Sequence, residues 1–349
     1  GAFAKSAQVP LHFWLPNAME APTPVSAFLH SATMVQAGIY ILARLNPVLG
    51  GTPAWTALLC GFGGLTLLWG SLAALRQTDL KQMLAQTTVA SLGLLVMFIG
   101  IGSKLALLGA LAYFAAHALY KAALFMVVGN LDKGTGTRDL TLLGGLREKL
   151  AATFIAAILA GFSMLGLAPA LGYVAKEEAY LALQSADPWP LLMLAVTVLG
   201  SAAIGAVAIA VAVKPFTGPP RDTPKPPRDG SLGLLLGPVL LGVLGVLAGI
   251  FAAPAGEFLL GPAAAAIAGA PVAAELHLAV DPLSPIFWLS VLTWAVAVGI
   301  YLRLADIRTL LRRWGQPSNW SFDRAFDAVV AGLVLGAAAI TRRLHHGRL

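Results

Sequence analysis

The sequence predicts an all-α fold, a polytopic bundle of transmembrane helices with about ten spans, two of which are discontinuous. Hydrophobic residues make up 58% of the 349 residues and charged residues only 11%, with a mean hydropathy of +0.80. Soluble domains carry roughly 25% charge. Charge-free windows of about 20 residues, the length that crosses a bilayer, also recur along the chain. The solvent for most of this chain is therefore lipid.

The first fifteen residues read as the inside of a membrane helix without an initiator Met, so we expect a piece of a longer protein. Pro10 and Pro16 interrupt this helix, because proline removes a backbone donor and kinks the chain. A second interruption is predicted at 166–172, where glycines and a proline break the span 151–175. Broken helices are tolerated at membrane depth mainly where they line a cavity or lie inside protein. The other predicted spans are 23–43, 54–75, 82–103, 105–129, 190–213, 231–253, 282–302 and 326–341.

A proline-rich linker, residues 216–230 (FTGPPRDTPKPPRDG), divides the chain. We assign residues 1–185 to the functional part of the bundle, 186–215 to a further transmembrane helix and 231–349 to a packing or scaffold region. This division rests on the ionisable and amide side chains, which lie mostly before the linker. The prolines and mixed charges of the linker predict an extended, solvated connection. Residues 258–274, rich in alanine and glycine, are predicted to be re-entrant or interfacial.

The formal charge of +7 does not predict nucleic-acid binding, because the basic residues are scattered and form no stripe with interleaved aromatics. Arginines that follow the spans 282–302 and 326–341 are typical of positive-inside loops. The single cysteine, Cys60, excludes a disulfide framework and a cysteine-based metal site. Neither a GxxxxGK[ST] loop nor an HExxH motif occurs. We therefore predict no cofactor, no metal centre and no catalytic residue.

An ionisable pair, His117 and Lys121, lies inside one of the most apolar stretches of the chain. Residues four apart on a helix share one face, so a proton can pass between the imidazole and the amine. A lysine at the bilayer centre costs roughly 2.5 to 3.5 kcal/mol on insertion scales and normally faces a bundle interior or a water-filled path. Lys5 and Lys176 each stand beside an interrupted helix, as in the discontinuous segments of repeat-built transporters. These placements predict ion movement.

Six blocks of sequence now indicate a family. They are KSAQVPLHFWLPNAMEAPTPVSA (5–27), LHSATM (29–34), QTDLKQMLA (77–85), HALYKAALF (117–125), GTRD (136–139) and GYVAKEE (172–178). In this order they resemble the proton-conducting membrane transporter family shared by respiratory complex I and Mrp-type antiporters. NAMEA (17–21), FMVVG (125–129), GTGTRD (134–139) and the tail after the linker are most similar to the large A subunit of multisubunit Mrp Na+/H+ antiporters. The motifs cover residues 1–185, and the rest agrees only in its pattern of spans.

The resemblance implies a chain of buried lysines and histidines, joined by water, that forms a proton channel within residues 1–185. Matched residue by residue, the proton relay is Lys5, His30, Lys81, His117, Lys121 and Lys176. In relatives, the lysine that matches Lys5 pairs with a glutamate on an upstream helix outside this sequence. Inward proton flow would drive sodium out across a bacterial inner (cell) membrane. The implied partners are other membrane subunits of the complex, the lipid bilayer, protons and a monovalent cation, Na+.

This sequence departs from the family at three positions. Gln36 stands where the large antiporter subunits often have lysine, and Tyr113 stands where complex I relatives often have another histidine. Ala168 stands before the proline of the second break, where a second proline is frequent. A glutamine still orients water, so the position stays of interest. The secondary candidates are Gln36, Glu177 and His12, the last predicted to face an aqueous mouth.

Structural alternatives stand beside these roles. Lys5 alternatively snorkels from a helix end, and Lys81 alternatively begins its span at the membrane interface. His30 alternatively hydrogen-bonds a neighbouring helix, His117 is alternatively a helix-packing histidine, and Lys176 alternatively forms an interfacial ion pair with the next residue. Two other functions stay open: a redox-driven proton-pumping subunit of complex I or a related hydrogenase complex, and a non-transporting membrane scaffold. We expect a secondary transporter subunit rather than an enzyme, since no substrate bond is made or broken.

Overall fold

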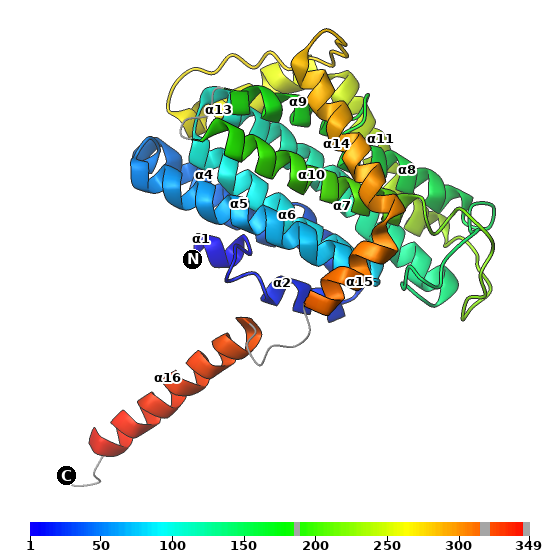
Figure 1. Ribbon diagram of the computed structural model, residues 1–349, viewed down its shortest axis with the longest axis horizontal. Coiled ribbons are helices and arrows are strands. Elements are labelled where there is room, and N and C mark those ends of the chain that lie inside the picture. Colours follow the sequence, from blue (N-terminus) through cyan, green and yellow to red (C-terminus); the bar gives the residue numbers. More distant parts are fainter. Residues whose placement is uncertain (185–188, 315–321, 345–349) are drawn as a thin grey trace.

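The structure, a computed structural model, describes residues 1–184, 189–314 and 322–344 (Figure 1). Eight of its helices are long and apolar enough to cross a membrane, and two shorter apolar helices, Ala151–Leu165 and Ala252–Ala268, accompany them. Within the described residues, strand-like pairing is limited to an isolated antiparallel bridge between Asp79 and Asp139. The predicted all-α, polytopic bundle is confirmed.

The first predicted element is broken. It consists of α1 (Ala2–Lys5), α2 (Trp14–Asn17) and the 3-10 turn η1 (Ala18–Glu20). The backbone between α1 and α2 is non-helical and contains Pro10. The indole of Trp14 donates to the Ala4 carbonyl at 2.9 Å and so holds the end of this segment against its beginning. The predicted discontinuous helix is present.

A further break, which the sequence analysis missed, divides the predicted span 23–43 into α3 (Thr23–Ser31) and α4 (Met34–Leu49). No proline lies at this break. The Ser31 hydroxyl donates to the Ala27 carbonyl at 2.6 Å, and the Thr33 hydroxyl donates to the Phe28 carbonyl at 2.7 Å. Side-chain hydroxyls that bond back to carbonyls compete with the helical ladder and bend or end helices.

The next three helices, α5 (Pro53–Arg76), α6 (Leu80–Ile101) and α7 (Lys104–Thr135), form the centre of the bundle. Helix α6 is the most enclosed, with 94% of its membrane window buried. Glycines let α5 and α6 approach closely, because a Cβ on Gly93 would lie 2.5 Å from the Leu67 nitrogen and one on Gly63 would lie 2.6 Å from the Met97 nitrogen. Small residues commonly provide such contacts between membrane helices.

The second predicted break separates α8 (Ala151–Leu165) from α9 (Leu171–Gln184). Gly166 ends α8 in the left-handed region, with φ of +73°. Glycine adopts this conformation without strain. A Cβ at Gly166 would also lie 2.6 Å from the Lys176 Nζ, so the break leaves room for a lysine amine. Helix α10 (Pro190–Ala212) follows.

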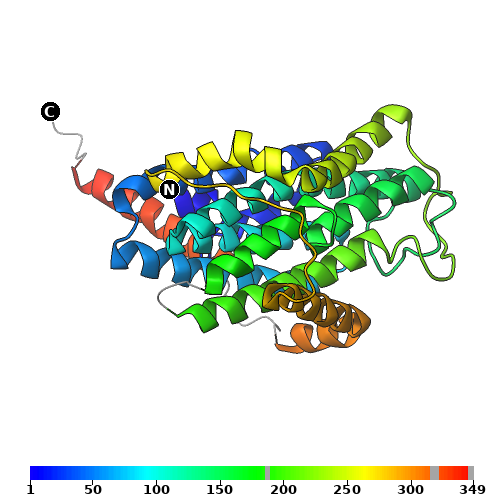
Figure 2. The same cartoon turned by 90° about the horizontal axis from the view of Figure 1, so that it is seen from above.

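The region after the linker packs directly on the bundle. Its elements are α11 (Leu232–Ile250), α12 (Ala252–Ala255), the π-helical turn η2 (Gly256–Leu260), α13 (Gly261–Ala268), α14 (Pro285–Leu302), α15 (Leu304–Trp314) and α16 (Phe322–Leu344). Helix α11 contacts α7, α8 and α9, whereas α14 contacts α9 and α10 from a different side (Figure 2). Helix α16 points away from the bundle, although Phe326 contacts Phe13 with ring centroids 5.0 Å apart (Figure 1).

The linker is attached to the loop that follows α7. The amide of Lys225 donates to the Thr135 carbonyl at 2.9 Å, and Arg221 donates to the Thr141 carbonyl. The Asp229 carboxylate accepts from the Ala152 amide at 3.0 Å and from the Thr153 hydroxyl at 2.6 Å. The linker therefore caps the first turn of α8 while most of its side chains stay exposed.

Basic residues gather at one end of the bundle, the end that carries the linker and α15. The described lysines and arginines of its loops and helix ends are Arg76, Lys133, Arg138, Arg147, Lys149, Lys214, Arg221, Lys225, Arg228, Arg303, Arg308, Arg312 and Arg313. In the described residues the connections and helix ends of the opposite end carry Arg44 and Lys104. Burial lowers the pKa of Lys214, and the charges of Arg308 and Arg221 lower it further. The positive-inside rule predicts that this basic end faces the cytoplasm.

Replacing Asp229 with Ala is expected to lower the free energy of unfolding by about 1 kcal/mol, because the first turn of α8 loses its capping carboxylate. The measurement is thermal unfolding of the detergent-solubilised parent protein. Asp222→Ala, which removes an exposed carboxylate of the same linker, is the control. Equal melting temperatures for the two variants would contradict a capping role.

Candidate functional site

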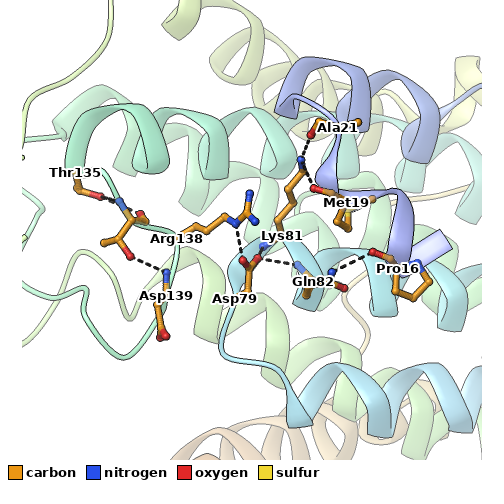
Figure 3. A network of polar contacts seen from close by, with 10 residues as sticks. Pro16, Met19, Ala21, Asp79, Lys81, Gln82, Thr135, Arg138 and Asp139 are labelled. Atoms are coloured by element: carbon orange, nitrogen blue, oxygen red, sulfur yellow. Dashed lines mark hydrogen bonds and ion pairs between the residues drawn. The ribbon is translucent and has the colours of Figure 1, made fainter. Parts of the chain in front are cut away.

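Lys81 lies in the first turn of α6, yet its side chain is only 1% exposed. Its Nζ donates to the Met19 carbonyl at 2.8 Å and to the Ala21 carbonyl (Figure 3). Met19 lies in η1, and Ala21 directly follows it, before α3. The structure therefore shows a buried amine held by backbone carbonyls.

A clip of polar contacts fixes the start of α6. Asp79 caps the helix by accepting from the amides of Lys81 and Gln82 at 2.8 and 3.1 Å. The same carboxylate pairs with Arg138 Nε at 2.5 Å (Figure 3). Gln82 Nε2 donates to the Pro16 carbonyl at 3.0 Å. The clip thus joins the QTDLK and GTRD blocks and aims Lys81 at the first broken element.

Lys121 is fully buried on α7. Its Nζ donates to the Leu84 carbonyl at 3.0 Å and to the Thr87 hydroxyl, both on α6. In the part of the chain that the structure describes, the recorded ion pairs join Arg138 to Asp79 and Arg303 to Asp306, and Lys121 has no carboxylate at that distance. Neutral oxygens alone therefore hold this amine.

His117 bonds to Gln36, with Nδ1 3.1 Å from the amide Nε2. The same amide nitrogen donates to the Ser31 carbonyl at 3.3 Å. A carbonyl only accepts, so the nitrogen of Gln36 faces Ser31 and donates to the imidazole as well. Nδ1 is then an acceptor, and the proton of the neutral ring sits on Nε2, which is buried without a partner. Gln36, the departure from lysine, thereby fixes the tautomer of His117.

His30 lies in the last turn of α3, before the break that was not predicted. Its ring stacks on Phe125 with centroids 5.5 Å apart and an interplanar angle of 29°. Both ring nitrogens are buried without a hydrogen-bond partner, so the structure does not show the predicted alternative of a bond to a neighbouring helix. The charges of Lys121 and Lys81 both act on this imidazole.

The structure therefore brings five candidates together where α3, α4, α6 and α7 meet. We call them the central group: His30, Gln36, Lys81, His117 and Lys121. Lys5 is exposed at the end of α1 and contacts none of them. His12 is buried against Trp69, with ring centroids 5.7 Å apart, rather than facing an open mouth.

The second break forms a separate site. Lys176 Nζ donates to the Leu165 carbonyl at 2.5 Å, at the end of α8. Glu177 accepts a hydrogen bond from the Ser290 hydroxyl of α14. The indole of Trp294, also on α14, donates to the carbonyl of Gly166, the residue that caps α8, at 3.1 Å. The region after the linker thus supplies side chains to this break, and Lys176 and Glu177 each bond to a different partner.

A cavity of about 880 Å³ lies between α3, α7, the linker and the start of α11. Asp132, Lys133 and Lys225 line it at the basic end. Ser31, whose carbonyl bonds to Gln36, lines it toward the central group. Its size and its mixed lining suit water. The cavity therefore extends from the basic end to Ser31, which is bonded to Gln36 of the central group.

The sequence analysis missed the groups that hold the buried amines. Four are backbone carbonyls, which no side-chain pattern reveals: Met19, Ala21, Leu84 and Leu165. The hydroxyl groups near the central group, in contrast, can be recognised from their spacing in the sequence. Thr87 and Ser91 are four apart on α6, and Tyr113 lies four residues before His117 on α7, so each pair shares the face of its helix that meets the other.

Broken helices around buried amines are typical of polytopic membrane proteins that accommodate ions within the bilayer. The chain belongs to a known family of this class: the model of the NADH:quinone oxidoreductase/Mrp antiporter transmembrane family matches residues 1–202.

Three relatives show which subunit of this family the chain resembles. The chain is 36% identical to the A subunit of a Na+/H+ antiporter of Alkalihalophilus pseudofirmus, over 95% of this chain and 45% of the relative. It is 38% identical to the corresponding antiporter protein of Bacillus subtilis, over 70% of this chain and 33% of the relative. A chain of the Mrp complex from Dietzia sp. DQ12-45-1b superimposes with a TM-score of 0.84 at 32% identity, over 100% of this chain and 38% of that chain. The chain thus spans less than half the length of these relatives, and the predicted resemblance is confirmed.

Ser31→Cys is expected to react with a membrane-impermeant thiol reagent several-fold faster in inverted vesicles than in right-side-out vesicles. The reason is that the cavity lies at the basic end, which the positive-inside rule places on the cytoplasmic side, and inverted vesicles expose that side to the reagent. The measurement is the mass shift of the parent protein, assembled in its complex and lacking Cys60. Ile41→Cys, exposed on α4 away from the cavity, is the control and should stay unlabelled. Equal labelling at positions 31 and 41 would contradict a water-filled cavity.

Proposed function

We propose that the chain is the proton-translocating part of a multisubunit Na+/H+ antiporter, in which buried lysines and histidines pass protons through water. The observation that carries this proposal is Lys121, a fully buried amine held by Thr87 and a carbonyl, one helical turn from His117. Among the described residues no carboxylate lies within ion-pair distance of this amine, and burying a charge without such a partner is costly, which argues against a purely structural role.

The central group supports proton transfer by its contacts. A buried amine is switched between its charged and neutral forms by nearby charge. The charges of Lys81 and Lys121 act on His30, so a proton gained at one of these sites disfavours a proton at the others. A proton that arrives at one end of the central group therefore changes the protonation of the residues at the other end. Histidine suits the intermediate steps because its unperturbed pKa lies near 6.5.

Water supplies the missing links. His30 has both ring nitrogens free of protein partners, and His117 has Nε2 free. A buried polar nitrogen without a protein partner is a place for an ordered water. The cavity beside Ser31 leads such waters to the basic end. Protons would therefore enter or leave the central group through the cavity, by way of His30 and Gln36.

The two outlying lysines complete the proposed relay. Lys176 sits at the second break, where its amine and Glu177 bond to different partners while their charges act on each other. The exposed amine of Lys5 contacts none of the central group. Lys5 is therefore included only on the basis of the resemblance to the family. Glu177 is proposed as the carboxylate that modulates Lys176, and His12 as a packing residue of the first break.

The assembly and the cation follow from the relatives. Large subunits of Na+/H+ antiporters and a chain of an Mrp complex match this chain over most or all of its length. We therefore propose that the chain works with other membrane subunits in a bacterial inner membrane, with Na+ as the exchanged cation. The complex I alternative differs in its energy source rather than in its site residues.

Replacing Lys121 with Met is expected to lower sodium-driven proton movement by about 100-fold, because a positioned proton-transfer group is lost. Methionine keeps the length of the side chain without its charge. The measurement uses inverted vesicles from an antiporter-deficient host that expresses the complete parent gene with its neighbouring genes. A pH-sensitive dye reports whether added sodium collapses a preformed proton gradient. Lys104→Met, exposed on the same helix, is the control.

Three outcomes separate the candidate functions. Loss in Lys121→Met with normal transport in Lys104→Met supports the antiporter. Wild-type vesicles that ignore sodium but pump with a redox substrate would assign the chain to complex I. Full sodium response in Lys121→Met would leave the lysine a packing role.

A further inference from the structure

A chain of three hydroxyl groups lies beside His117 and has no part in the relay described above. Ser91 Oγ of α6 is 2.9 Å from the Tyr113 hydroxyl of α7. The Tyr120 hydroxyl donates to the same Tyr113 oxygen at 3.2 Å. Ser91 and Tyr120 are buried, and Tyr113 is nearly so. Three hydroxyls bonded in series inside a membrane bundle call for a reason.

The two tyrosines lie on either side of His117 along α7. The Tyr120 ring meets the imidazole edge-on, with centroids 5.5 Å apart at 74°, and the Tyr113 ring lies 6.4 Å away at 35°. Gln36 on α4 occupies Nδ1 of the imidazole. Nε2 is the other ring nitrogen, so it points away from Gln36, and the rings of Tyr113 and Tyr120 lie on either side of the imidazole along the helix. Nε2 is also the nitrogen that carries the proton.

Tyr113 has the hydrogen-bonding capacity to accept from the Nε2–H of His117. A phenol hydroxyl has one proton to donate and two lone pairs to accept with. Tyr113 accepts from Tyr120, and its own proton is available to Ser91. One lone pair is left. The Nε2–H of His117 is buried without an acceptor, which is costly inside a protein, and one bridging water satisfies both.

On the other side of Tyr113 the described residues line an apolar space. Toward the beginning of α7 the space between the helices is a small apolar cavity of about 20 Å³. Among its lining residues are Ile39 of α4, Leu95 of α6, Phe114 of α7 and Ile267 of α13. The hydroxyl chain therefore ends at an apolar cavity. Its role is local, at His117.

We infer that Tyr113 is a positioning residue for His117: its hydroxyl, held by Ser91 and Tyr120, accepts through one water from His117 Nε2–H. Together with Gln36 on the other nitrogen, it fixes the orientation and the tautomer of the imidazole. This inference rests on the proposed proton relay. It assigns the departure at position 113 a role that an imidazole at the same place also performs.

The test measures sodium-driven proton movement by the whole complex in inverted vesicles, as a function of pH and of sodium concentration. Tyr113→Phe is expected to lower the maximal rate about tenfold, as loss of a partner does for other functional histidines, and to leave the half-saturating sodium concentration unchanged. Tyr113→His is expected to restore the rate with a shifted pH profile. Tyr301→Phe, which removes a half-buried hydroxyl on α14, is the control.

The outcomes separate this inference from the proposed function. Wild-type vesicles without a sodium response overturn the antiporter itself. Wild-type activity in Tyr113→Phe, with Lys121→Met inactive, overturns only the role of Tyr113. If Tyr113→Phe fails to assemble, Tyr113→His decides: an assembled and active complex with a shifted pH profile supports the inference, and an assembled but inactive one overturns it.

Discussion

The structure depends on how it holds buried lysine amines on backbone carbonyls and a hydroxyl of the bundle. Lys81 and Lys176 both use carbonyls that a break in a helix releases: Met19 lies in the short turn η1 of the first break, and Leu165 is the last residue of α8. The last carbonyls of a helix lack intrahelical partners. A break inside the membrane therefore creates a strong acceptor at a depth where few others exist, and the lysine in turn satisfies a carbonyl that lipid would leave unpaired. Each feature stabilises the other.

Much of this fold follows from the sequence. The spans follow from composition, and two breaks follow from their prolines and glycines. The break after Ser31 does not, because Ser31 and Thr33 end α3 through hydroxyl bonds to carbonyls. Serine and threonine occur often in continuous membrane helices, so their presence alone does not mark a break. Tertiary geometry decides which of them bond backward.

The candidate site was also only partly predictable from the sequence. The pair on α7 is evident from its apolar surroundings, whereas Lys81 follows Arg76 and Asp79 and reads locally as the edge of a span. Only the resemblance indicated its importance, and only the structure shows why it is buried: Asp79 is occupied by Arg138 and by the amides of α6, so it does not pair with the lysine beside it. The contribution of α14 was missed because its Ser290 and Trp294 stand in a span that is otherwise apolar.

The glycine contact between α5 and α6 has a mechanical consequence. Backbones in direct contact at Gly63 and Gly93 leave no layer of side chains to slide or repack, and the Asp79–Arg138 clip ties the start of α6 to the loop after α7. The three central helices then behave as one stiff frame. Rocking of one half of the bundle against the other would have to break this frame. The proposed proton relay would then work through side-chain rotamers and through water entering small spaces, without rocking of one half of the bundle against the other.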